Sequence, residues 1–367
     1  MKVVVYTLGV LTAVILGSRW FLANPQPKDI SPWPEFEPIS QIMISSHLFD
    51  FGGLASELMT AAKKENIKVS VLEDLNPMVE NWSEIKAKNS DVAFLPMAHS
   101  GVWIRDFAPL NIDITQKSNG LASLGFADFN YKLEPTLDDI LPWQLALYFK
   151  ASLIKTPFTV DGGNFIATRD DCFLADDFID RAPSDAIDKL TSEKERISNM
   201  IGKEFGCRAH IFSNSPHPHI DMILKPISHN QIVISQIPDY VVSHLSKNKA
   251  LNLDETIAVQ GKLNEIAKTL EDDLHFKVIR IPMPSPSSRL FRNYVNSIIL
   301  EKTILMPTYK ESAHPTESYP DKDLLERLES EARKTYESLG FKVIPLNSDR
   351  IIAAGGSLHC VTLTIPK

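Results

Sequence analysis

Four short segments combine acidic, basic and nucleophilic side chains in patterns that could carry out chemistry. Singly, each has an ordinary structural interpretation, because a Gly-Gly pair is commonly a turn and an isolated cysteine is often a small core residue. Together they supply a thiol nucleophile, a histidine that can transfer protons, and several carboxylates. The segments are Trp103-Ile104-Arg105-Asp106, Asp161-Gly162-Gly163-Asn164, His219-Ile220-Asp221 and Gly355-Gly356-Ser357-Leu358-His359-Cys360.

The carboxylates indicate a substrate group that is planar and cationic. A guanidinium is planar and rich in N–H donors, and paired carboxylate oxygens match it through charge-assisted hydrogen bonds. Asp106 and Asp221 are the candidates for this role. His219 lies two residues before Asp221, so on a β-strand both side chains would face one cleft. Attack of the Cys360 thiolate on a guanidinium carbon would give a roughly neutral adduct, which calls for carboxylates rather than an oxyanion hole.

In their order along the chain, these segments resemble the agmatine deiminase and bacterial (Porphyromonas-type) peptidylarginine deiminase family of guanidine-modifying enzymes. The resemblance extends over about residues 40–364 and includes Tyr294-Val295-Asn296-Ser297, which is similar to a Tyr-x-Asn segment of that family. It implies the pentein fold, an α/β propeller of five ββαβ units around a central active-site channel. It also implies that the chain is a hydrolase acting on the carbon–nitrogen bonds of linear amidines.

The chemistry and the resemblance together suggest a role for each candidate residue. Cys360 would attack the guanidinium carbon to form a thiouronium intermediate, and His219 would protonate the departing ammonia and then activate water. Asp106 and Asp221 would hold and polarise the guanidinium. His359 adjoins Cys360 but would face the opposite side of a strand, so it is not the expected base. The resemblance implies that the remaining candidates would bind substrate: Trp103, Asp161, Gly163, Asn164 and Asn296.

The expected substrate is a small cationic guanidine such as agmatine or free arginine, or an arginine-containing peptide. Where bacterial peptidylarginine deiminases place two arginines that clamp a substrate carboxylate, this chain has Lys132 and Glu134. Glu134 would suit the amine of agmatine, although both residues could equally be solvated loop charges. The segment Phe107-Ala108-Pro109, and Asp161 in place of glutamate, also depart from the agmatine deiminase pattern. The sequence therefore leaves the substrate open, and no cofactor or metal is expected.

Three other functions are compatible with parts of this pattern. His217, His219 and Asp221 alternate in a way that could present metal ligands on one strand face, as in a metal-dependent amidinohydrolase, but a second Asp-x-Asp cluster is missing. An amidinotransferase of the same superfamily would resolve the intermediate with an amine instead of water. A catalytically inactive binding protein would not need the thiol, histidine and carboxylates that the chain retains.

Composition and the N-terminus define the setting of this chemistry. The 367 residues have 44% hydrophobic content and a net charge of -8, which indicates a globular protein and argues against nucleic acid as a partner. Lys2 and the apolar run from Val3 to Leu16 predict a signal peptide or a membrane anchor over residues 1–23, and therefore an exported or membrane-tethered protein. Five prolines predict a semi-rigid linker over residues 24–38, so the catalytic domain is expected to span 39–367.

The elements that must position the site follow a repeating strand–helix–strand pattern. Helical periodicity recurs at spacings of roughly 60–70 residues, with short β-branched runs on both sides, which is typical of an α/β fold. The predicted helices cover 54–65, 184–205, 254–273 and 321–339. The predicted strands cover 41–45, 68–72, 91–95, 231–235, 278–281, 297–300, 303–306 and 342–344.

Three cysteines raise the question of a disulfide. In an exported protein an odd number suggests one bridge and one free thiol. Cys360 must stay free to react, so the hypothesis is that Cys172 pairs with Cys207. The alternative is that all three are reduced.

Overall fold

The computed structural model describes residues 29–75, 79–115, 122–131, 136–177, 193–287, 290–310 and 322–367. The predicted signal or anchor segment, 1–23, lies outside the described residues, as do Lys132, Glu134 and the start of the helix predicted from 184. In the part of the chain that is described, no helix combines the length and the apolar character needed to cross a bilayer.

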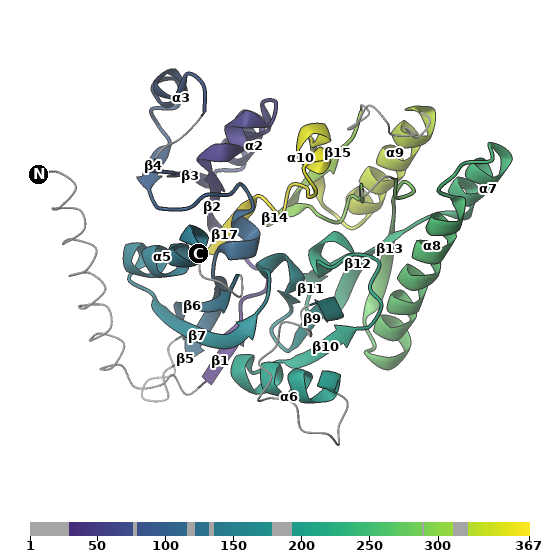
Figure 1. Cartoon of the computed structure of the whole chain (residues 1–367), viewed down its shortest axis with the longest axis horizontal. Helices are drawn as coiled ribbons and strands as arrows, with labels where there is room; N and C mark the ends of the chain where they lie inside the picture. The colour runs from purple at the N-terminus through teal and green to yellow at the C-terminus, as the bar shows by residue number, and fades with distance from the viewer. Residues whose placement is uncertain are drawn as a thin grey trace, which may run out of the picture.

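Within the described residues the strands form five small sheets arranged around a common centre (Figure 1). One sheet has the order β17 (Thr362–Pro366), β2 (Ile39–Ser45), β3 (Lys68–Glu73), β4 (Ala93–Pro96). The next has β1 (Asp29–Pro32), β5 (Leu110–Thr115), β6 (Ala122–Asn130), β7 (Ser152–Thr159). The others are β10 (Arg208–Phe212), β9 (Asp171–Ala175), β8 (Ile166–Ala167); β11 (Leu224–Ser228), β12 (Gln231–Gln236), β13 (Lys277–Pro282); and β14 (Ile298–Leu300), β15 (Thr303–Thr308), β16 (Lys342–Asn347).

Every sheet contains the same unit, an antiparallel pair followed by a helix and a parallel strand. In the fourth unit, for example, β11 pairs antiparallel with β12, and β12 pairs parallel with β13. This is the five-unit pentein arrangement expected from the resemblance, and the predicted fold class is confirmed. The helices between the parallel strands are α2 (Leu54–Lys64), α5 (Leu141–Phe149), α6 (Glu193–Phe205), α7 (Asp239–Lys247) with α8 (Leu253–Lys268), and α9 (Lys322–Ser338). Shorter helices are α3 (Trp82–Lys88), α4 (Ile104–Phe107) and α10 (Asp349–Ala353).

Helix α9 shows how the sequence specifies these crossover helices. Leu325, Leu328, Ala332 and Tyr336 recur at helical spacing and are buried, while the rest of the helix is largely polar. Gly340 follows with a φ of 90°, a left-handed conformation that glycine adopts without strain and that ends the helix as predicted.

The last strand closes the ring onto the first unit. β17 pairs antiparallel with β2, with Leu363 opposite Met43, and both residues are buried in one apolar cluster. Because Cys360 stands two residues before β17, closure of the ring also fixes the position of the thiol.

The predicted boundary at Ile39 is wrong for residues 29–38, which belong to the folded body. β1 pairs antiparallel with β5, with Asp29 opposite Thr115 and Pro32 opposite Ile112. β1 is an edge strand, and at an edge a proline's missing N–H costs little, so the proline-rich composition did not prevent pairing. The strands β5 to β11 and β17 were also missed, because several are short or lack regular alternation.

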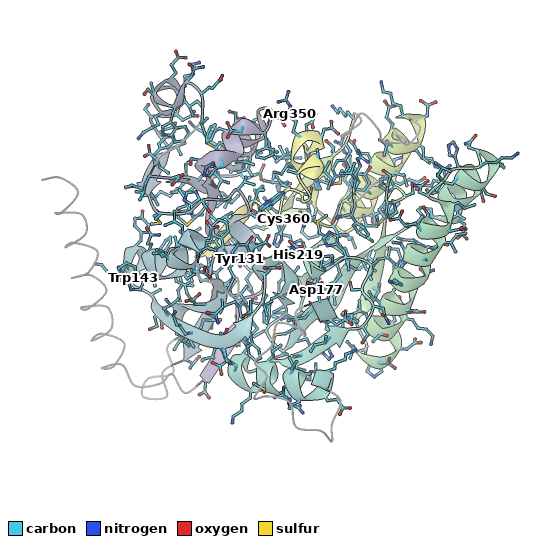
Figure 2. The ribbon with its side chains drawn as sticks, viewed as in Figure 1. Tyr131, Trp143, Asp177, His219, Arg350 and Cys360 are labelled. Carbon is cyan, nitrogen blue, oxygen red and sulfur yellow. A yellow bond between two sulfur atoms is a disulfide. The ribbon has the colours of Figure 1, made fainter. Side chains whose placement is uncertain are left out.

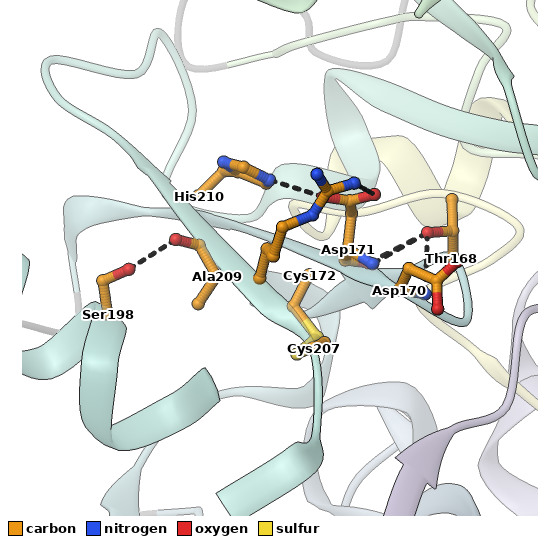
Figure 3. Close-up of a disulfide and its surroundings, with 9 residues drawn as sticks. Thr168, Asp170, Asp171, Cys172, Ser198, Cys207, Ala209 and His210 are labelled. Carbon is orange, nitrogen blue, oxygen red and sulfur yellow. Dashed lines mark hydrogen bonds and ion pairs between the residues drawn. A yellow bond between two sulfur atoms is a disulfide. The ribbon is translucent and has the colours of Figure 1, made fainter. Parts of the chain in front are cut away.

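The hypothesis that Cys172 and Cys207 form a disulfide is confirmed (Figure 3). Cys172 lies in β9, and Cys207 lies between α6 and β10, with their Cα atoms 5.9 Å apart. Both side chains are buried. Cys360 is the remaining, free cysteine.

Candidate active site

The candidate nucleophile, Cys360, is buried in the turn that precedes β17, near the centre of the molecule (Figure 2). Its Sγ lies 3.3 Å from Asn296 Nδ2 and 3.6 Å from Asp221 Oδ2. The turn is fixed by two backbone contacts: the N–H of His359 donates to Asn296 Oδ1 at 2.9 Å, and the N–H of Arg105 donates to the Cys360 carbonyl at 3.1 Å.

His219 and Asp221 both reach the site, but not from a strand. Residues Ile220–Met222 form a 3-10 helix that His219 caps, so the prediction of a shared strand face is wrong in its geometry. His219 Nδ1 lies 3.5 Å from Asp106 Oδ1, and its Nε2 lies 3.3 Å from Asp161 Oδ2. His219 thus bridges two carboxylates. The negative charge of Asp221 raises the pKa of both His219 and the Cys360 thiol.

Glycine is required at position 163 because three candidate catalytic side chains pack closely against it. Its N–H donates to Asp106 Oδ1 at 3.2 Å. A Cβ at this position would lie 2.8 Å from Asp106 Oδ1, 2.9 Å from His219 Nδ1 and 3.3 Å from Asp221 Oδ2. Three of the predicted residues therefore converge on the face that Gly163 leaves open. The second glycine of the Gly-Gly pair therefore makes room for these side chains, in addition to forming a turn.

Two other predicted substrate-binding residues, Trp103 and Asn164, make contacts with the surrounding fold. Trp103 packs against Gly356, where an added Cβ would come within 2.5 Å of the indole ring. The structure does not place the Asn164 amide among the candidate catalytic side chains. That amide donates to the carbonyl of Ala175 at 3.0 Å and accepts from its N–H at 2.8 Å, and so anchors the 161–164 segment to β9.

Burial and charge separate the proton affinities of these groups. Burial, together with Asp221 and Asp161 and despite His219, raises the pKa of Asp106 to about 7. Burial lowers the pKa of His219, but Asp106, Asp161 and Asp221 raise it more, to about 9. Burial would raise the pKa of Asp221, but His359, His219 and Lys225 outweigh it, and the net pKa is lowered. Burial, Asp221 and Asp106 raise the pKa of the Cys360 thiol well above its ordinary value.

Sequence reasoning missed a second layer of charged residues behind Asp221. The prediction that His359 points away on a strand is wrong, because residues 358–361 form a turn. His359 Nδ1 lies 2.7 Å from Asp221 Oδ2, and its Nε2 lies 2.7 Å from Glu35 Oε2. Glu35 also binds Arg105 and Lys225. Arg105 belongs to one of the four segments that stand out in the sequence. Glu35 lies in the predicted linker, and no pattern in the sequence indicated a role for it.

The alternating histidines that suggested a metal site do not converge. His217 Nδ1 accepts the backbone N–H of His219 at 3.1 Å, and the two rings pack edge to face with centroids 5.8 Å apart. Burial and the neighbouring His219 lower the pKa of His217 to about 4. Across the described ranges, no three histidine, cysteine or acidic side chains form a group that could hold a metal ion.

A model of the family described as Porphyromonas-type peptidyl-arginine deiminase matches residues 50–366. The chain belongs to this family. It is accordingly a hydrolase of the agmatine and peptidylarginine deiminase group, which acts on carbon–nitrogen bonds of amidines, as the resemblance predicted.

Individual relatives are distant in sequence and similar in fold. A protein of Marinomonas sp. (strain MWYL1), provisionally named agmatine deiminase, is 22% identical over 57% of this chain and 55% of its own length. The structure of a C. jejuni agmatine deiminase variant with substrate bound has a TM-score of 0.65 at 20% identity, covering 94% of this chain and 98% of that one. An Enterococcus faecalis agmatine deiminase has a TM-score of 0.67 at 13% identity, with 92% and 96% covered.

Proposed function

We propose that the chain hydrolyses the guanidine group of agmatine or of free or peptide-bound arginine through a covalent intermediate on Cys360. One observation carries the proposal. Asp221 Oδ1 is buried and has no hydrogen-bond partner among the described residues, while Asp221 Oδ2 lies 3.6 Å from the thiol. A guanidinium that donates to Asp221 would satisfy this oxygen and present its carbon to Sγ. Asp106, which borders the same face of Gly163 as Asp221, would receive further N–H groups of the same cation.

The charge of the substrate would activate the thiol. Burial, together with Asp221 and Asp106, raises the pKa of Cys360 well above its ordinary value, so the free site carries a neutral thiol. A bound guanidinium offsets both carboxylates, and the thiol can then release its proton to solvent. The thiolate would thus form where its target is already held.

The remaining steps use His219 as an acid and then as a base. The thiolate adds to the guanidinium carbon and forms the C–S bond. His219, protonated at neutral pH by its raised pKa, donates a proton to the departing nitrogen, and the C–N bond breaks with release of ammonia. Neutral His219 then takes a proton from water as it attacks the thiouronium carbon. The C–S bond breaks, which releases a ureido product and restores the thiolate; the remaining proton converts ammonia to ammonium.

The test is ammonia release from agmatine, free arginine and arginine-containing peptides by the wild type and by Cys360→Ser. We expect release from at least one substrate, insensitivity to EDTA, and loss of turnover in Cys360→Ser with an unchanged unfolding curve. Substantial activity in the variant would contradict nucleophilic catalysis by Cys360. Loss of wild-type activity in EDTA, restored by a metal, would favour a metal-dependent amidinohydrolase. Transfer of the amidino group to an added amine would favour an amidinotransferase.

We further propose that the protein acts outside the cytosol, exported or tethered by its N-terminus. The Cys172–Cys207 disulfide supports this, because such bonds persist mainly in oxidising compartments, and so does the apolar run after Lys2. Expression of the full chain followed by separation of cytosolic, membrane and exported fractions tests it. Protein recovered solely from the cytosol, with three reactive thiols on unfolding, would contradict the proposal.

A further inference from the structure

A chain of alternating charges runs from the candidate catalytic carboxylate to the N-terminal segment. His359 lies between Asp221 and Glu35, at 2.7 Å from an oxygen of each. Glu35 in turn lies 2.8 Å from Arg105 Nη1 and 2.9 Å from Lys225 Nζ. All five side chains are sheltered, with exposed fractions of 20% for Glu35 and 4% or less for the others.

The hydrogen bonds fix the charge of the histidine in this chain. Burial raises the pKa of Glu35, but Arg105, His359 and Lys225 lower it further, and the net pKa is well below its ordinary range. Asp221 is lowered as well. Both groups are therefore carboxylates, which only accept hydrogen bonds. His359 must donate from both ring nitrogens and so carries a positive charge, held between two anions.

Glu35 is tied to the neighbours of three candidate catalytic residues. Arg105 immediately precedes Asp106, Lys225 follows the 3-10 helix that carries Asp221, and His359 immediately precedes Cys360. Glu35 itself is held in place by the pairing of β1 with β5 and by the N–H of Trp33, which donates to the Asn111 carbonyl at 3.0 Å. One carboxylate from the proline-rich segment thus joins three units of the ring at the site.

We propose that Glu35 is a positioning residue for the deimination: acting through His359, it keeps Asp221 ionised and directed at the thiol and the substrate guanidinium. The catalytic role of Glu35 rests on the proposed function. The contacts of Glu35 with His359, Arg105 and Lys225 are present in the free protein and do not depend on that function.

Replacing the Glu35 carboxylate by an amide should change the state of Asp221. In Glu35→Gln, Arg105 and Lys225 lose their carboxylate partner, and His359 loses the second carboxylate that fixes its ring beside Asp221. Asp221 then faces an imidazole that no second carboxylate holds, with Cys360, His219, Lys225 and Asp106 as its other ionisable neighbours. Asp221 should bind a proton more readily, so the acidic limb that Asp106 begins near pH 7 should gain a second ionisation and become steeper in the variant. Each tenfold gain in the proton affinity of Asp221 costs about tenfold in kcat/KM where both carboxylates are protonated.

Glu37→Gln is the matched control. Glu37 lies in the same segment, undergoes the same loss of charge, and pairs with His229 at 3.6 Å rather than with this network. Two measurements apply to both variants: the pH profile of ammonia release, and the rates at which cationic chloroacetamidine and neutral iodoacetamide alkylate Cys360. Because Cys172 and Cys207 are paired, alkylation of the folded protein reports on Cys360 alone.

We expect Glu35→Gln to lower the ratio of chloroacetamidine to iodoacetamide rates about tenfold or more and to steepen the acidic limb, with Glu37→Gln resembling the wild type. An unchanged ratio and limb in Glu35→Gln, or equal losses in both variants, would overturn the proposal. If Glu35→Gln does not fold, Glu35→Asp, which keeps the charge but shortens its reach, replaces it. A wild type that releases no ammonia from any guanidine would refute the proposed function, while the alkylation ratio would still decide the role of Glu35.

Discussion

Asp106 and His219 lie 3.5 Å apart, and the pKa of each group is raised above its ordinary value. Asp106 has a pKa of about 7 because it is buried beside two other carboxylates. Burial lowers the pKa of His219, but Asp106 and the same two carboxylates raise it more, to about 9. Between these values Asp106 is an anion and His219 is a cation. In these states Asp106 can bind the guanidinium of the substrate, and His219 can donate a proton to the leaving nitrogen.

We therefore predict a bell-shaped pH profile of kcat/KM. Protonation of Asp106 removes one carboxylate of the clamp, so the rate should rise as pH increases through about 7. Deprotonation of His219 removes the acid, so the rate should fall as pH increases through about 9. Ammonia release measured from pH 5 to 11 tests both limbs, with protein stability followed in parallel. A rate that keeps rising beyond the upper limb would exclude His219 as the acid.

The close approach of three side chains to Gly163 gives a second prediction. In Gly163→Ala the new methyl group would meet Asp106, His219 and Asp221 at 3.3 Å or less, so these side chains must separate. Displacements of this size in a reacting constellation cost on the order of 100-fold in rate. Gly261→Ala is the control, because a Cβ there has no neighbour within 4 Å. Steady-state kinetics of both variants, with matched unfolding curves, would show whether the loss is confined to Gly163→Ala.

At the scale of elements, the helices and the central strands could be predicted from the sequence, whereas the turns that carry the site could not. The periodicity of α2, α8 and α9 and the β-branched runs of β3 and β15 are local signals. The orientation of His219, Asp221 and His359 depends on a 3-10 helix and a turn whose shape is set by tertiary contacts such as that of His359 with Asn296. Glu35 was missed for the same reason. The proline content of residues 24–38 predicts a stiff segment, but it does not indicate which strand that segment pairs with.

The third unit is cross-linked by the disulfide between β9 and the end of α6, and this predicts its effect on stability. Cys172 and Cys207 are separated by 35 residues, and a bridge over such a loop contributes about 3–4 kcal/mol in the chain-entropy model. We expect the double variant Cys172→Ala/Cys207→Ala to lose free energy of unfolding on this order and to keep its kcat/KM at 25 °C. Denaturant unfolding with and without reductant checks it, since reductant should destabilise the wild type and leave the double variant unchanged.

At the scale of the whole molecule, the site exists because the ring is closed. Its side chains come from different units, with Asp106 from α4, His219 and Asp221 from the 3-10 helix before β11, and Cys360 from the turn before β17. Each group lies close to the centre, so a modest opening of the ring would separate the thiol from its carboxylates. Stability and catalysis should therefore depend together on the pairing of β17 with β2.

Removing the closing strand tests this dependence. We expect a chain that ends at Val361 to lose activity and to unfold at a lower denaturant concentration, because β2 would lose its antiparallel partner and the buried Leu363 and Ile365 would leave their apolar cluster. Burial of two such side chains is worth about 3–6 kcal/mol, a large part of the stability of an ordinary domain. Removal of Lys367 alone is the control, because that residue is exposed and lies outside the strand. Wild-type kinetics in the longer truncation would mean that the thiol is positioned by the turn at 358–361 without the closing strand.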